Sequence, residues 1–134
     1  MGRYLIDNNV IANYFAGTFS EKAVDFLSTI INETPYLSVV TKIEALSWRS
    51  VNQMKEVAVK SFVNYSNIIP LADTIVEKCI EIRRACRIKT PDAIIAATAI
   101  VYDFTLLTSD SDFDRIPNLK ILDPFDLQTI KRGQ

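Results

Sequence analysis

The stretch IKTPDAIIAATA, residues 88–99, carries the clearest structural signal in the chain. Thr90 is a good N-cap residue, and Pro91 suits the first position of a helix, where its missing N–H costs nothing. Residues 93–101 are apolar on nearly every face, which predicts a buried helix over 91–102. Asp92 would then stand in the first turn of a helix that otherwise belongs to the core. It either complements the helix dipole alone or joins a site that other carboxylates share.

The composition restricts the chemistry that this chain can perform. Its 134 residues are 49% hydrophobic and 23% charged, which is typical of one globular domain, expected to span residues 1–134. The absence of histidine excludes Ser–His–Asp and Cys–His nucleophile systems and histidine-ligated zinc. The formal net charge of -1 gives no strongly basic surface at the level of the whole chain. Carboxylates without imidazoles or clustered thiols favour hard cations such as Mg²⁺ or Mn²⁺.

The cysteines and the N-terminus indicate the compartment. Cys79 and Cys86 fall in one predicted helix, about 10 Å apart along its axis, which is too far for a disulfide. Reduced thiols are typical of the cytosol. The N-terminus lacks the apolar core of a signal peptide, and no apolar run approaches the roughly 20 residues of a membrane span. We therefore expect a cytoplasmic protein with no membrane contact.

Short apolar runs alternate with amphipathic stretches along the chain. Buried strands are predicted at residues 3–7, 36–40, 67–71, 104–108 and 119–122. Helices are predicted at residues 8–15, 20–32, about 42–48, 53–65, 73–87, 91–102 and 124–130, with Ser20, Thr41 and Asp73 as N-caps and a frayed tail from Lys131. This alternation predicts an α/β fold with a mostly parallel central sheet of about five strands flanked by helices.

Acidic residues follow several of the predicted strands. Asp7 closes the first strand, Glu44 lies one turn into the helix after the second, and Asp110 and Asp112 follow the fourth. Asp92 can face the same edge of the sheet, where ligands of parallel sheets bind. Each acid alone is equally consistent with an ordinary turn, a helix cap or an exposed helix face. Together they crowd like charges, which is costly unless a cation lies among them, so the set predicts a metal site.

Four segments carry a family resemblance: YLIDNNVI (4–11), SVVTKIEAL (38–46), KTPDAIIAATA (89–99) and LLTSDSDF (106–113). Their order and spacing resemble the PIN domain of the VapC-type toxin ribonucleases, over essentially the whole chain. The resemblance implies a single PIN-like domain and a metal-dependent endoribonuclease that cleaves phosphodiesters by metal-activated water.

The implied catalytic quartet falls on Asp7, Glu44, Asp92 and Asp110. Asp7, Asp92 and Asp110 would hold Mg²⁺ or Mn²⁺, with Asp112 as an alternative or additional fourth acid. Supporting polar residues match at Asn9 and Thr108. The chain departs from the family at Asn8, where a small hydroxyl residue is usual, and an amide there is expected to tune activity rather than abolish it.

The resemblance also implies an RNA substrate, a small antitoxin partner and a homodimer. Because RNA is repelled by an acidic centre, cations must surround it, and Lys42, Arg49, Lys89 and Arg115 are candidates, with Arg83, Arg84 and Arg87 preceding the Asp92 helix. These cations equally suit a solvated surface or a helix C-terminus. Apolar residues at Tyr14, Phe15, Trp48 and Met54 suit either a groove for a partner helix or the core.

Two other interpretations remain open. The same fold could serve RNA processing without a toxin role, or could belong to a catalytically weak RNA-binding relative. A phosphate-handling or signalling domain could use Asp7 as a phospho-acceptor. A haloacid-dehalogenase-like phosphatase would, however, need an aspartate where Asn9 stands, and no lysine follows the last core strand as a receiver domain requires.

Overall fold

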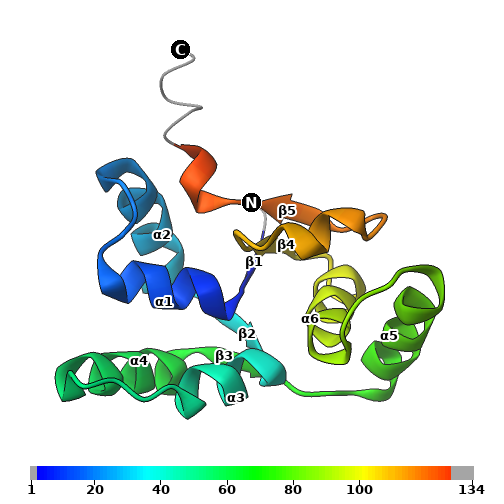
Figure 1. Cartoon of the computed structure of the whole chain (residues 1–134), viewed down its shortest axis with the longest axis horizontal. Coiled ribbons are helices and arrows are strands. Elements are labelled where there is room, and N and C mark those ends of the chain that lie inside the picture. Colours follow the sequence, from blue (N-terminus) through cyan, green and yellow to red (C-terminus); the bar gives the residue numbers. More distant parts are fainter. Residues whose placement is uncertain (1–2, 128–134) are drawn as a thin grey trace.

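A computed structural model describes residues 3–127 as an α/β fold built on one parallel sheet (Figure 1). The five strands lie in the order β3-β2-β1-β4-β5, and every neighbouring pair is parallel. The strands are β1 (Tyr4–Ile6), β2 (Tyr36–Ser38), β3 (Asn67–Ile69), β4 (Thr105–Leu107) and β5 (Lys120–Leu122). The predicted fold class is thereby confirmed, although each strand is shorter than predicted.

Helices connect the strands and cover both faces of the sheet. The α-helices are α1 (Asn8–Ala16), α2 (Glu21–Glu33), α3 (Val39–Ser47), α4 (Gln53–Tyr65), α5 (Asp73–Ala85) and α6 (Thr90–Val101). Two short 3-10 helices follow, η1 (Ser111–Arg115) and η2 (Pro124–Asp126). Helices α5 and α6 lie together on one side of the sheet, while α1 to α4 lie on the other (Figure 1).

Alternating residues of the central strands feed two separate cores. Leu5 and Leu106 face the core that α5 and α6 close, whereas Ile6 and Leu107 face the core of α1 to α4. Strands buried on both faces need continuous apolar runs, as the sequence provides. Four alanines of α6 at 93, 96, 97 and 99 are completely buried, which lets this helix lie close to the sheet and to α5.

Several helices begin at other residues than predicted. Ser38 rather than Thr41 caps α3, because its hydroxyl accepts the Val40 N–H, and the chain therefore leaves the strand two residues early. Thr41 is instead fully buried. Helix α6 begins at Thr90, with Lys89 as its N-cap and no side-chain cap, and α5 begins at Asp73 after Ala72. A side-chain cap therefore marks the start of α3 but not the starts of α5 and α6, so capping residues alone did not predict these boundaries.

The remaining differences concern element ends. Strand β3 lies at the predicted edge but ends at Ile69, because Pro70 has no N–H to donate to a ladder. Helix α5 ends at Ala85, so Cys86 caps it instead of lying inside, and Cys79 and Cys86 are both free. The last predicted helix is a 3-10 turn over Pro124–Asp126; residues 128–130 and the tail from Lys131 lie outside the described residues. Within residues 3–127, no helix has the length and apolar character needed to cross a bilayer.

Candidate metal centre

The site is built where the two central strands end. Strands β1 and β4 are adjacent and in register, with Ile6 opposite Leu107. Asp7 leaves β1 at this edge, and its N–H donates to the Leu107 carbonyl at 3.0 Å. Thr108 leaves β4 beside it, and both side chains are buried. The carboxyl ends of the strands thus bring residues about a hundred positions apart into contact, as expected for a site in an open parallel sheet.

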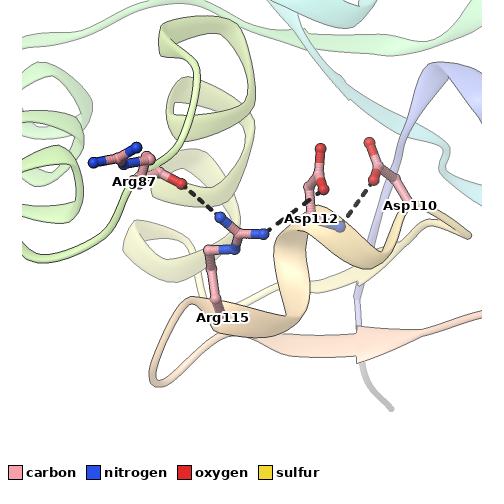
Figure 2. A network of polar contacts seen from close by, with 4 residues as sticks. All are labelled: Arg87, Asp110, Asp112 and Arg115. Atoms are coloured by element: carbon pink, nitrogen blue, oxygen red, sulfur yellow. Dashed lines mark hydrogen bonds and ion pairs between the residues drawn. The ribbon is translucent and has the colours of Figure 1, made fainter.

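Three carboxylates converge next to this edge. Asp92 in the first turn of α6, Asp110 and Asp112 each place an oxygen so that all three oxygens lie within 4.8 Å of one another. Asp110 is the N-cap of η1, and its Oδ1 accepts the Asp112 N–H at 2.9 Å (Figure 2). The buried ring of Phe113 anchors η1 in the core. The structure therefore gathers both candidates for the fourth acid, Asp110 and Asp112, rather than one of them.

Asp7 lies beside this cluster but outside the mutually close set. Its side chain is 5% exposed and accepts hydrogen bonds from three donors. The Asn8 N–H donates to Oδ1 at 2.9 Å, while Asn9 Nδ2 and Thr108 Oγ1 donate to Oδ2 at 3.0 and 2.8 Å. The predicted supporting residues Asn9 and Thr108 thus contact the first acid directly. Glu44, on the exposed side of α3, also lies outside the close set.

The acids influence one another's protonation. Burial raises the pKa of Asp7, and the nearby Asp92 and Asp110 charges raise it further, although its hydrogen bonds from Thr108 and Asn8 act in the opposite direction. Partial desolvation, followed by the Asp7 and Asp92 charges, raises the pKa of Glu44. Asp92 has a raised pKa through partial burial and through Asp110 and Asp112, offset in part by Lys89. All four predicted quartet positions therefore belong to one electrostatic unit.

The donor set fits a hard divalent cation. It offers carboxylate oxygens alone, which Mg²⁺ and Mn²⁺ prefer, and it contains no nitrogen or sulfur ligand. Three anions at this distance repel one another, and a cation among them removes that cost. Asp92, Asp110 and Asp112 are the residues that would hold it directly.

The predicted RNA-binding cations differ in their surroundings. Arg115 is already engaged: its Nη1 donates to the Arg87 carbonyl at 3.0 Å, and its Nη2 lies 4.0 Å from Asp112 Oδ1 (Figure 2). It therefore ties η1 to the loop before α6, a structural role that the sequence did not indicate. Lys42, Arg49 and Lys89 are exposed. Lys89 lies near enough to Asp92 to lower the pKa of that carboxyl.

Sequence reasoning missed Ser109. Its N–H and its hydroxyl both donate to Asn9 Oδ1, each at 3.2 Å. A serine between Thr108 and Asp110 was a local signal for a polar site, but nothing in one sequence pairs it with a residue one hundred positions earlier. Thr41 was considered only as a cap; its buried hydroxyl has no hydrogen-bond partner among the described residues.

The four apolar residues considered for a groove divide into two pairs. Tyr14 and Phe15 are half-buried against the core of α1 to α4. Trp48 and Met54 are exposed by 42% and 81% of their surface. A hollow of about 140 Å³ lies among α1, α3 and α4, and its lining includes Ile11, Phe15, Trp48 and Val59.

Comparison with known proteins gives a consistent result. The family model described as PIN domain matches residues 4–119. No curated protein matches the chain significantly. Among solved structures, DNA-bound VapBC from Salmonella typhimurium matches with a TM-score of 0.76, 17% identity and coverage of 92% of this chain and 99% of that chain.

Two further structures agree with it. FitAcB from Neisseria gonorrhoeae matches with a TM-score of 0.74, 24% identity and coverage of 91% and 98%. A toxin–antitoxin complex from Klebsiella pneumoniae matches with a TM-score of 0.71, 24% identity and coverage of 90% and 97%. At these identities the structural likeness establishes the fold.

Proposed function

The chain belongs to the PIN-domain family, and from this premise we propose that it is a Mg²⁺- or Mn²⁺-dependent endoribonuclease, the toxin of a toxin–antitoxin pair. The observation that carries the proposal is the convergence of Asp92, Asp110 and Asp112 carboxylate oxygens within 4.8 Å. PIN domains are typically metal-dependent nucleases, and the chain has no histidine to serve as the base of a Ser–His–Asp or Cys–His mechanism.

Each acid has a distinct part in this proposal. Asp92, Asp110 and Asp112 would hold the cation, which when bound would supply Lewis acidity toward water and toward the charge of a phosphodiester. Asp7 lies beside them and orients the site through the hydrogen bonds that it accepts from Asn9 and Thr108. Burial and the Asp7 and Asp92 charges raise the pKa of Glu44, which makes this carboxylate a better proton acceptor for water.

The proposal is tested by cleavage of a generic structured RNA with Mg²⁺ or Mn²⁺ present, with EDTA as the metal-free control. We expect Asp92→Asn to abolish both metal binding and cleavage. Asp73→Asn is the matched control, because Asp73 also stands in the first turn of a helix but lies outside the acidic cluster. Equal cleavage by all three proteins would show that the nuclease is a contaminant and that the cluster is not catalytic.

Lys42, Arg49 and Lys89 are the exposed cations that we assign to RNA contact. Each phosphate contact contributes to the salt dependence of binding. Replacing any one of them by alanine should therefore weaken RNA binding and reduce the salt slope by about one. An unchanged salt dependence of RNA binding in all three variants would show that these residues do not contact the RNA.

The apolar hollow among α1, α3 and α4 supports a small antitoxin as the partner. Trp48 lines this hollow, and Val51 and Met54, next in sequence to the lining residues Ser50 and Lys55, also expose large apolar side chains, which suits the apolar face of an amphipathic helix. Two of the similar structures are by name toxin–antitoxin and VapBC complexes. Co-purification with the product of an adjacent small gene, lost in Trp48→Ala, supports the toxin role in a cytoplasmic pair.

Two outcomes lead to the alternative functions. Active enzyme with no such partner supports an RNA-processing nuclease, and RNA binding without cleavage supports a catalytically weak relative.

We also propose a homodimer through α5, where Val76 and Ile80 are exposed by 37% and 55% beside a hollow of about 540 Å³. Sedimentation of the wild type and of Ile80→Asp would test it, with a monomeric wild type as the contrary result.

A further inference from the structure

We propose that Asn9 is a positioning residue within a directed hydrogen-bond chain, which begins at Ser109 and sets the orientation of the Asp7 carboxylate beside the metal centre. The inference rests on the proposed function. It assigns the orientation of Asp7 to residues that are not themselves the cation-binding acids. Four side chains take part: Ser109, Asn9, Thr108 and Asp7. They join the end of β1 to the end of β4.

The direction of the chain is determined at Ser109. Its backbone N–H can only donate, and it donates to Asn9 Oδ1 at 3.2 Å. The carboxamide of Asn9 therefore has one orientation, with its oxygen toward Ser109 and its NH₂ toward Asp7 and Thr108. Both amide hydrogens are used, one toward Asp7 Oδ2 at 3.0 Å and one toward Thr108 Oγ1 at 3.1 Å.

The Thr108 hydroxyl transmits this direction. Its oxygen accepts from Asn9 Nδ2 and from the Asp110 N–H, each at 3.1 Å. Because both acceptor positions are filled, its single proton is directed at Asp7 Oδ2, 2.8 Å away. The same oxygen atom thus connects the first acid of the site with the backbone of Asp110.

Asp7 is held as an acceptor with its two oxygens in different environments. Oδ2 receives two hydrogen bonds from the chain, whereas Oδ1 receives only the Asn8 N–H among the described residues. These three hydrogen bonds restrict rotation of the carboxylate, and Oδ1, with one donor among the described residues, keeps lone-pair capacity for a further partner. Partners of this kind orient metal-site carboxylates, and their loss typically weakens metal affinity about 10- to 100-fold.

The test measures Mn²⁺ binding alone, from the electron paramagnetic resonance signal of free Mn²⁺, without RNA. Asn9→Ala removes both amide hydrogens, and we expect its affinity for Mn²⁺ to fall about 10-fold. Asn13→Ala is the matched control: Asn13 lies one turn later on α1 and, within residues 3–127, its amide donates to the Asn9 backbone carbonyl alone, at 2.8 Å. This control should keep wild-type affinity.

A second pair of variants separates positioning from folding. Thr108→Val keeps the shape of the side chain but removes the hydroxyl, and it should weaken Mn²⁺ binding as Asn9→Ala does. Thr108→Ser restores the hydroxyl and should restore the affinity. If Thr108 had a merely structural role, its variants would lower the melting temperature, but Thr108→Val and Thr108→Ser would not differ in Mn²⁺ affinity.

The outcomes distinguish this inference from the function on which it rests. Wild-type Mn²⁺ affinity in Asn9→Ala and Thr108→Val, with loss in Asp92→Asn, overturns the positioning role while the metal centre stands. No Mn²⁺ binding by the unsubstituted protein overturns both. If Asn9→Ala does not fold, the Thr108 pair alone decides.

Discussion

Asp92→Asn should stabilise the metal-free protein, because it removes a charge from a crowded cluster. Oxygens of Asp92, Asp110 and Asp112 lie within 4.8 Å of one another. At that separation, like charges repel by about 0.9 kcal/mol in water and about 3.5 kcal/mol at an effective dielectric constant of about 20. Since Asp112 is exposed and Asp92 and Asp110 are only half-buried, the lower figure applies, or about 2 kcal/mol for two pairs.

Two losses oppose this gain. A neutral carboxamide in place of the Asp92 carboxylate forgoes about 0.3–1 kcal/mol of interaction with the N-terminus of α6. It also loses the attraction of Lys89, which lowers the Asp92 pKa in the wild type. The net stabilisation is about 1 kcal/mol, equivalent to a rise of about 4 °C in melting temperature for a domain of this size.

Calorimetry at pH 7 in EDTA, followed by a Mg²⁺ or Mn²⁺ titration, measures this effect. A cation at about 100 times its Kd stabilises the wild type by about 2.7 kcal/mol, so the order of the two melting temperatures should reverse. Asp73→Asn, which loses only a helix-dipole interaction, should be slightly destabilised in both conditions. A metal-free Asp92→Asn protein less stable than the wild type would refute the reasoning, since Asp92 would then be a helix-start acid alone.

Three further predictions follow from the same site. The pKa values of Asp7, Glu44 and Asp92 are raised in the folded state, so the folded protein takes up protons before the unfolded chain does. The stability of the metal-free protein should therefore rise as pH falls from 7 through those raised values. Melting curves from pH 7 to 5 check this, and a decline in that window would contradict it. Phe113→Ala should cost about 3–5 kcal/mol, seen in urea unfolding, since the ring is fully buried beneath η1, and a cost below that range would mean that η1 is not anchored there. Arg115→Ala should lower the free energy of unfolding by about 1 kcal/mol, because the hydrogen bond to the Arg87 carbonyl is lost. Arg115→Lys should not restore this stability, because lysine lacks the guanidinium fork. Full restoration by lysine would contradict a role for the guanidinium geometry.

Local and periodic signals in the sequence were sufficient for the architecture. The alternation of apolar runs with amphipathic stretches predicted the parallel sheet, because strands buried on both faces and helices buried on one face differ in hydrophobic period. The alanine-rich segment after Asp92 predicted a buried helix, and α6 is one. The acids at strand ends predicted one edge of the sheet as the site, since parallel strands bring their carboxyl ends together.

Only the tertiary structure decided which of these residues meet. It placed Asp110 and Asp112 together with Asp92, left Asp7 beside this set but outside it, and joined Ser109 to Asn9 across one hundred positions. It also engaged Arg115 with a backbone carbonyl, and it began α3 at Val39 in place of the position after Thr41. The physical reason is that periodicity and capping act over a few residues, whereas side-chain contacts between β1, β4 and α6 depend on strand register and helix packing that no local pattern encodes.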